Sequence, residues 1–135
     1  MLFYGPALRH VTGPGFLRSH EDRSTTAVDA LRAFHSALAK RNIALVVLPV
    51  PSKASIYPEA LVGGTDLRAP LLNPSHEAFL QRLEASGIGV VDPASILVKA
   101  KGDFETYLAQ DSHWSPEGMD VVAHAVARYI EKQVV

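Results

Sequence analysis

The chain has 135 residues, of which 47% are hydrophobic and 20% are charged, a balance typical of one folded domain and not of a disordered polypeptide. Thirteen Lys and Arg against fourteen Asp and Glu give a net charge of −1, so no basic excess is present to hold nucleic acid. The absence of cysteine excludes disulfide scaffolds, thiolate metal sites and cysteine nucleophiles. We therefore treat residues 1–135 as a single domain.

The first 23 residues contain glycines and prolines among scattered apolar side chains, a composition that predicts short extended pieces and turns. No cationic leader followed by a long apolar stretch is present after Met1, so we expect no secretory signal in this sequence. The longest apolar run, residues 43–50, is far shorter than the roughly 20 residues that a membrane span needs. We therefore expect no membrane span in this chain.

Residues 24–40 have the period of an amphipathic helix, because apolar side chains recur three or four positions apart. Ser24, Thr25 or Thr26 would cap this helix. Its apolar stripe consists of Val28, Leu31, Phe34 and Leu38. Residues 43–50 are β-branched and apolar throughout, which predicts a strand covered on both faces.

A second helix–loop–strand unit follows a loop through residues 63–70. The helix of this unit opens at Asn73-Pro74 and ends before Gly87. Its inward-facing residues are Phe79, Leu80 and Leu83. Residues 88–92 predict the second strand, and residues 93–100 a short helix. Two such units predict an α/β fold with a mainly parallel sheet between helical layers.

The last helix has the clearest signals in the chain. Ser115 is a typical cap residue, Pro116 suits the first helical position, and Glu117 suits the positive helix end. The apolar stripe of this helix consists of Met119, Val122, Val126 and Ile130.

Candidate functional residues cluster in loops that would lie at the carboxyl edge of the sheet, where parallel sheets place their ligands. These loops are residues 51–55, the turn at Asp92-Pro93, and residues 107–116. Lys53 lies on the first of them, where it could pair with Asp92 or Asp111, present charge to an anionic substrate, or simply be solvated.

Asp111 and His113 form the most informative pair. Pro116 disfavours helix at the preceding residue, so the run into the last helix is expected to be extended or turned. In an extended segment, residues two apart face the same side, about 6.6 Å apart along the chain. The carboxylate could then reach Nδ1 of the imidazole and leave Nε2 as a base toward a nucleophile. Trp114 could form a wall of this site or stack on a sugar ring.

Several alternatives stay open from the residues alone. Asp111 could cap a turn beside a structural His113, or His113, Glu117 and His124 could bind a metal, although no dense cluster with catalytic-zinc spacing is present. Ser52 and Ser55 could supply a nucleophile, but neither lies in a Gly-x-Ser-x-Gly elbow or a Gly-Asp-Ser sequence. The remaining histidines, His10, His20, His35 and His76, are expected to have no chemical role.

Two strings resemble the SGNH-hydrolase-like domain of the AlgX/AlgJ type of alginate O-acetyltransferases. One is Leu48-Pro-Val-Pro-Ser-Lys-Ala-Ser-Ile-Tyr57-Pro-Glu59, and the other is Tyr107-Leu-Ala-Gln-Asp111-Ser-His113-Trp114-Ser-Pro-Glu-Gly118. Leu2-Phe-Tyr4 and Thr12-Gly-Pro-Gly-Phe-Leu17 also look like the start of that domain, so the similarity covers essentially the whole chain.

The resemblance implies a three-layer α/β/α, SGNH-hydrolase-like fold. It also implies that the protein transfers acetyl groups to hydroxyls of an exopolysaccharide in the bacterial periplasm. An acetyl-donor membrane protein would be its partner, and no cofactor or metal would be needed. It implies that Asp111 orients His113, the general base. From the residues themselves we also expect Lys53, Tyr57 and Trp114 to contact substrate. The nucleophilic serine of such proteins lies in a block downstream of the last helix. We expect that block, and the strand that carries it, to be absent here, so the domain would be incomplete and the isolated chain inactive.

Two other functions are compatible with the residues. The first is a small esterase that uses Ser52 or Ser55. The second is a non-catalytic polysaccharide-binding or assembly module, in which Trp114, Tyr107 and Tyr57 stack on sugars while Lys53 meets uronate carboxylates.

Overall fold

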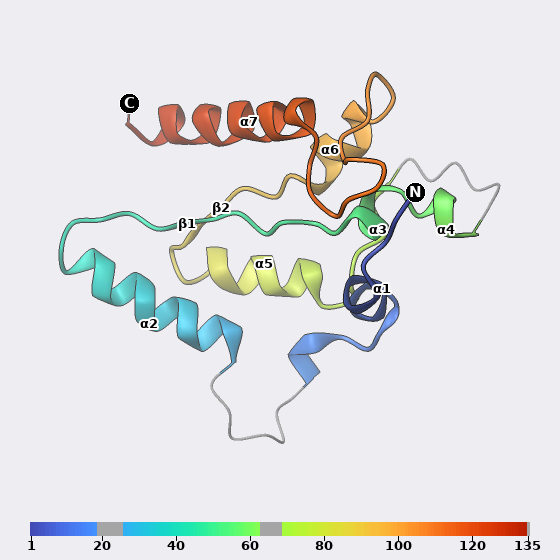
Figure 1. The fold of residues 1–135 in the computed structure, drawn as a ribbon. Helices are drawn as coiled ribbons and strands as arrows, with labels where there is room; N and C mark the ends of the chain where they lie inside the picture. Colours follow the sequence, from blue (N-terminus) through green and yellow to red (C-terminus); the bar gives the residue numbers. More distant parts are fainter. Residues whose placement is uncertain (19–25, 63–68, 135) are drawn as a thin grey trace.

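The computed structural model describes residues 1–18, 26–62 and 69–134, and has a short parallel sheet with helices on both of its faces (Figure 1). Strand β1 (Val46–Val47) pairs with β2 (Gly89–Val90) in parallel, with Val46 opposite Gly89 and Val47 opposite Val90. The predicted α/β architecture with a parallel sheet is confirmed.

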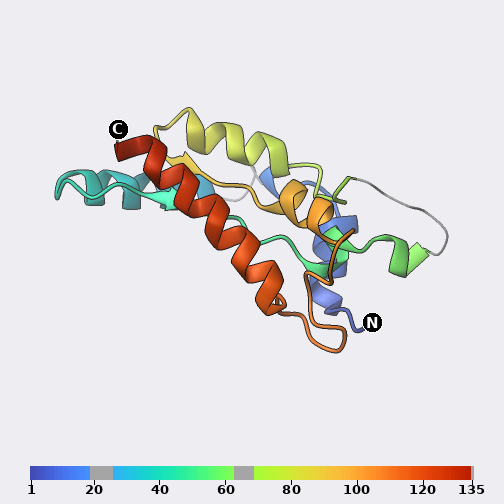
Figure 2. The same ribbon diagram turned by 90° about the horizontal axis from the view of Figure 1, so that it is seen from above.

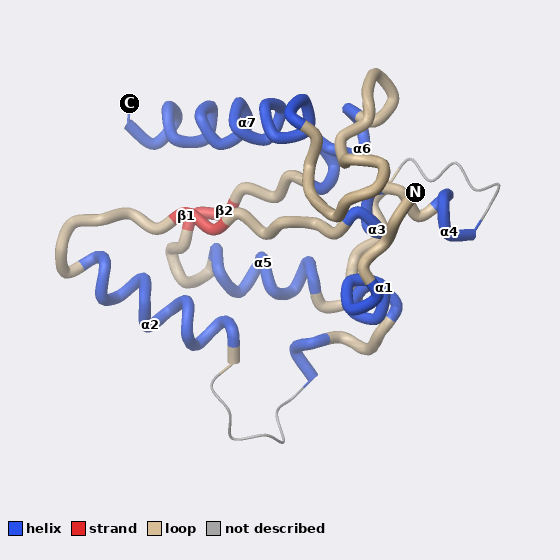
Figure 3. The backbone as a smooth tube through the Cα atoms, in the orientation of Figure 1, coloured by secondary structure: helices blue, strands red, loops and turns tan. Residues whose placement is uncertain are grey.

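The strands are much shorter than predicted (Figure 3). Only two residues of each strand pair in the described chain, and Ile43 and Val50 are 43% and 66% exposed, so the expectation that residues 43–50 form a strand covered on both faces was wrong. Pro49 and Pro51 lack the amide hydrogen that a longer ladder needs. The sheet is incomplete in that one edge of β1 has no neighbouring strand among the described residues and the residues flanking β1 are exposed.

Helices α2 (Ala27–Ala39) and α5 (His76–Glu84) lie on one side of the strands, and α7 (Pro116–Val134) lies on the other (Figures 1 and 2). Thr26 caps α2 through a capping box with Asp29, which confirms one of the three predicted caps, while Ser24 and Thr25 lie outside the described residues. Phe34, predicted to face inward, is 54% exposed, whereas Leu31 and Leu38 of the same stripe are partly buried.

The N-terminal segment differs from its predicted turns and extended pieces. Residues Gly5–Thr12 form helix α1, and Phe16–Arg18 form a short 3-10 turn, while residues 19–23 lie outside the described part of the chain. Pro6 is compatible with helix because it occupies the first turn, where its missing amide hydrogen costs nothing. The prediction missed this helix because Gly5-Pro6 also has the composition of a turn.

The shorter helices lie at the end of the molecule that faces the carboxyl ends of both strands. They are α3 (Lys53–Ile56), α4 (Glu59–Val62) and α6 (Ala94–Ala100). The predicted helix at residues 93–100 is thus confirmed, whereas residues 51–55, predicted as a loop, contain the first turn of α3. Ser52 caps α3 by accepting a hydrogen bond from the amide of Ser55 at 3.2 Å.

Two hydrophobic clusters flank the sheet. The larger one joins α3, α6 and α7 through Ile56, Tyr57, Ala94, Leu97, Val98, Tyr107 and Val122. The smaller one joins α2, α5 and the start of β2 through Val28, Leu83 and Ile88. Among the described residues, no helix is both long enough and apolar enough to cross a membrane.

Helix α7 begins as predicted. Ser115 accepts a hydrogen bond from the amide of Gly118 at 3.0 Å, and Pro116 is its first residue. Only part of the predicted stripe is covered, because Val122 is 2% exposed whereas Met119 and Ile130 are 60% and 48% exposed. The outer half of the stripe therefore lies open beside the free edge of β1.

Candidate active site

The candidate site lies on a tight hairpin formed by residues 107–114. Tyr107 and Trp114 form an isolated antiparallel bridge, and the amide of Leu108 donates to the carbonyl of His113 at 3.1 Å. At the tip, the amide of Asp111 donates to the carbonyl of Leu108 at 3.3 Å. The segment is turned, one of the two non-helical conformations that Pro116 predicted.

Asp111 and His113 are paired at the exposed end of this hairpin. Nδ1 of His113 lies 2.6 Å from Oδ1 of Asp111, and the backbone amide of His113 donates to the same oxygen at 3.1 Å. Together with the amide of Ser112, these bonds hold the pKa of the Asp111 carboxyl below its usual range, the side-chain bond from His113 being the largest cause. The predicted contact between carboxylate and imidazole is confirmed.

This contact determines the tautomer of His113. An ionised carboxylate only accepts hydrogen bonds, so the proton lies on Nδ1 and the lone pair lies on Nε2. The side chains of His113 and Asp111 are 81% and 50% exposed, so Nε2 is open to an approaching group. The arrangement can accept a proton from a hydroxyl placed beside Nε2.

Lys53 supports the hairpin from beneath. Its ammonium donates to the backbone carbonyls of Leu108, Ala109 and Asp111 at 2.5, 2.9 and 2.9 Å, and the residue is only 3% exposed. Burial lowers its pKa, against the opposing effect of Glu105 and Asp111. Of the alternatives left open for Lys53, the solvated side chain is therefore excluded. The lysine meets the carbonyl of Asp111 and not its carboxylate, so its contact with substrate stays a prediction that this burial does not favour.

Tyr57 belongs to the core, not to an exposed sugar platform. Its hydroxyl lies 3.1 Å from Oγ1 of Thr106 and accepts from the Thr106 amide at 2.8 Å, and the residue is 7% exposed. Tyr107 is 1% exposed and donates its hydroxyl to the carbonyl of Pro51. The proposed stacking of Tyr57 and Tyr107 on sugars is therefore not available in this conformation, because neither ring face is accessible.

Trp114 turns away from the hairpin tip. Its ring packs edge-on against that of Tyr107, with centroids 6.5 Å apart, and lines an apolar groove between Leu48 and the outer face of α7. In the described part of the chain, its buried Nε1 has no hydrogen-bond partner. Its predicted role as substrate contact stays a prediction.

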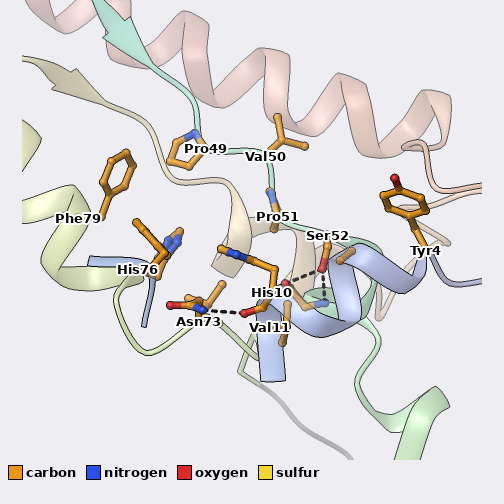
Figure 4. Close-up of a pocket in the computed structure, with 14 residues that line it drawn as sticks. Tyr4, His10, Val11, Pro49, Val50, Pro51, Ser52, Asn73, His76 and Phe79 are labelled. Atoms are coloured by element: carbon orange, nitrogen blue, oxygen red, sulfur yellow. Dashed lines mark hydrogen bonds between the residues drawn. The ribbon is translucent and has the colours of Figure 1, made fainter. Parts of the chain in front are cut away.

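The two candidate serines lie in a different pocket. Oγ of Ser52 lies 3.0 Å from Oγ of Ser55, and both residues line a cavity bounded by α1 and the start of α5 (Figure 4). Asp111 lines a separate, smaller pocket next to Leu2 and Phe3. Within the described residues neither serine hydroxyl is hydrogen-bonded to His113, so nothing in this geometry favours the small esterase.

Sequence reasoning missed two features of the site. The first is Gly118, where an added Cβ would lie 2.2 Å from the carbonyl oxygen of Thr106, so that only glycine allows α7 to approach the base of the hairpin. The second is His76, which was expected to have no chemical role and is paired with Asp92 at 2.8 Å. Asp92 lies two residues after β2, at the carboxyl edge of the sheet, a position that could have signalled a partner.

The metal alternative finds no support in the described residues, where no group of three or more His, Asp or Glu side chains could hold a metal ion. Nδ1 of His113 contacts Asp111, and Nδ1 of His124 lies 2.9 Å from the carbonyl oxygen of Asp120.

Comparison with known proteins identifies the family of the chain. A family model described as "SGNH hydrolase-like domain, acetyltransferase AlgX" matches residues 12–135. The chain belongs to this family. It is 33% identical over 102 residues to a probable alginate O-acetylase AlgJ of Pseudomonas aeruginosa, and 32% identical over 101 residues to that of Azotobacter vinelandii. These alignments cover 76% and 75% of this chain but 26% of each relative, so the chain spans about a quarter of their length.

A solved structure supports the fold of this AlgX-type domain. The O-acetyltransferase domain of Pseudomonas putida AlgJ superposes with a TM-score of 0.64 at 23% identity, covering 79% of this chain and 38% of that one. The SGNH-hydrolase-like fold predicted from the two sequence strings is confirmed, and the strands and helices described above correspond to part of a larger domain in that relative.

Proposed function

We propose that residues 1–135 carry the acid–base half of an O-acetyltransferase that acts on hydroxyls of an exopolysaccharide such as alginate. The observation that carries the proposal is the 2.6 Å contact between Nδ1 of His113 and Oδ1 of Asp111, with Nε2 exposed. The family match and the alginate O-acetylase relatives support the reaction class. The proposal includes a periplasmic site of action and an acetyl-donor membrane protein as partner.

In this mechanism His113 acts as the general base. Nε2 removes the proton of a serine hydroxyl while the serine oxygen attacks the acetyl carbonyl of the donor, and the imidazolium then protonates the departing group. In the second half, Nε2 takes the proton of a sugar hydroxyl, which attacks the acyl-serine, and the serine oxygen recovers that proton. Asp111 stabilises the imidazolium and holds its orientation throughout.

The nucleophilic serine of this proposal lies outside residues 1–135. None of the serines in this sequence belongs to a Gly-Asp-Ser or Gly-x-Ser-x-Gly string, and the hydroxyls of Ser52 and Ser55 are hydrogen-bonded to each other. Lys53 has a positioning role here, because it holds three carbonyls of the hairpin that presents His113.

The first test is whether the genomic reading frame continues beyond Val135 into a serine block. The second test measures, by mass spectrometry, the transfer of acetyl groups from an ester donor to an oligosaccharide. With a serine block present, we expect His113→Ala and Asp111→Asn each to lower the transfer rate on the order of 10³–10⁴-fold. The matched control is His124→Ala, since His124 also lies near an aspartate but on the exposed face of α7. Residues 1–135 alone should give no appreciable turnover; rapid His113-dependent acetate release from them would contradict the proposal.

A further inference from the structure

A cavity of about 380 Å³ lies at the carboxyl end of both strands, outside the hairpin (Figure 4). Residues 49–52, which follow β1, form one wall, and His76, which is paired with the Asp92 that follows β2, forms another. This volume lies in the roughly 300–1,000 Å³ range of small-molecule sites, and the position is where parallel α/β sheets bind ligands.

The walls of the cavity are largely apolar and aromatic. The rings of His10 and Phe16 are stacked with centroids 5.5 Å apart, and Phe16 meets Phe79 edge-on at the same distance. Pro49, Val50 and Leu72 extend this surface. Aromatic faces of this kind suit the C–H face of a sugar ring.

Three polar groups face the same space with bonding capacity left. Nε2 of His76 donates to Asp92 at 2.8 Å, so its Nδ1 is an acceptor, and no described residue bonds to that nitrogen. The described residues likewise offer no partner to the ring nitrogens of His10. In the view of Figure 4, the imidazole of His10 lies between the side chains of His76 and Ser52. Ser55 is buried and can donate its hydroxyl to Ser52, which leaves the Ser52 proton free to point outward.

The charge of the cavity selects among ligands. No Lys or Arg is found among the described residues that line it, and the carboxylate of Asp92 lies directly behind His76. A purely apolar ligand would leave the side chain of His76, which is 16% exposed, without a partner for Nδ1. An anionic ligand would meet no fixed cation. A neutral, hydroxylated ring satisfies both conditions.

We propose that this cavity binds one neutral pyranose residue of a glycan. The ring stacks its C–H face on Phe79, gives hydroxyl protons to Nδ1 of His76 and to a ring nitrogen of His10, and accepts from the hydroxyl of Ser52. Tyr4 lines both this cavity and the adjoining one that Asp111 lines, so the two pockets share a wall. Binding of the sugar does not require Asp111, His113 or any acyl transfer.

The test measures binding of methyl β-D-glucopyranoside to the purified chain, with methyl β-D-glucuronide as the matched anionic probe. We expect saturable NMR shifts of the Phe16, Phe79, His10 and His76 ring signals with the neutral glycoside, at an affinity on the order of millimolar. The glucuronide should bind at least about fivefold more weakly. Tighter binding of the glucuronide, or no saturable shift with either probe, would overturn the proposal.

Variants separate this site from the catalytic proposal. His10→Ala leaves the carbonyl that accepts from Asn73 in place, and His76→Ala removes the proposed acceptor. Each should weaken glucoside binding about five- to tenfold, the loss expected for one hydrogen bond or one stacking face. His124→Ala and His113→Ala should bind like the unmodified chain. Unchanged binding in His10→Ala sinks the inference even if His76→Ala fails to fold.

Discussion

Tyr107 begins the hairpin that presents Asp111 and His113, and its side chain is buried. The ring is 1% exposed, and its hydroxyl donates to the carbonyl of Pro51, at the end of the segment that leads from β1 to α3. Burial raises the pKa of this phenol to about 12. One buried hydroxyl therefore ties the hairpin to the sheet.

This raised pKa predicts a loss of stability in alkaline solution. The unfolded phenol ionises near pH 10 and the folded one near pH 12, so the stability linked to the neutral Tyr107 is present below pH 10 and is lost as the pH rises toward 12. The linkage corresponds to about 2–3 kcal/mol. Urea unfolding should show that the stability difference between the unmodified chain and Tyr107→Phe narrows over this pH range. A constant difference would mean that the phenol is accessible.

At the scale of elements, α3 and the hairpin form one unit because Lys53 joins them. The Lys53 ammonium donates hydrogen bonds to three carbonyls of the turn, as a capping group does to the free backbone groups of a helix end. Lys53 is only 3% exposed. The ring of Phe3 lies 5.8 Å from the same ammonium, and the amide of Leu2 donates to the carbonyl of Ala109 at 2.9 Å. The N-terminal residues thus complete the enclosure of Lys53.

Lys53→Met should destabilise the chain and loosen the hairpin. We expect a loss of about 1–3 kcal/mol in the free energy of unfolding, because three carbonyls lose a charged donor while the alkyl chain is kept. Amide exchange of Leu108, which bonds to His113 across the hairpin, should accelerate. Lys99→Met, at an exposed position on α6, is the control and should change neither quantity. Equal stability and exchange in the two variants would refute the supporting role.

The contact between α7 and the base of the hairpin depends on the absence of a side chain at position 118. A Cβ there would lie 2.2 Å from the carbonyl oxygen of Thr106, which already accepts from the amide of Ser115. Gly118→Ala should therefore cost about 2–3 kcal/mol, since helix and hairpin must separate. Gly102→Ala, whose Cβ would lie 3.5 Å from the carbonyl oxygen of Lys99, should change stability by less than about 0.5 kcal/mol. Chemical denaturation of both variants decides the point.

For the whole molecule, the main consequence of a two-stranded sheet is that α7 is covered on one side only. Its outer apolar face forms a groove with Leu48 and Trp114 and includes Met119 and Ile130, which are 60% and 48% exposed. The matched relatives are about four times as long as the aligned segment, so in them further chain is available to cover such a surface.

Alanine substitutions can show whether this face is open in solution. Met119→Ala should change the free energy of unfolding by less than about 0.5 kcal/mol, whereas Val122→Ala, at a residue 2% exposed, should cost about 2 kcal/mol. If Met119→Ala proved as costly as Val122→Ala, the groove would be filled in solution by another copy or another segment, and unfolding should then depend on protein concentration.

The sequence by itself determined the local features. Residues 24–40, 93–100 and 116–134 have the periodicity, caps and N1 proline that helices need, and these signals act within a few residues of one another. The pairing of Asp111 with His113 was predictable for the same reason, because two residues separated by one other in a turn meet without help from the rest of the chain. Ser115 and Pro116 likewise need only their neighbours to begin α7.

Only the tertiary structure decided which side chains are buried and which are open. From its neighbours in the sequence, Lys53 cannot be distinguished from a solvated loop lysine. Its burial depends on carbonyls more than fifty positions away. Tyr57 and Tyr107 lost their predicted role as sugar platforms because each lies inside the packed cluster between α6 and α7. The cavity beside His10 and His76 exists because α1, α5 and the end of β1 meet there. Burial is a property of contacts between distant segments, and no local pattern in the chain encodes it.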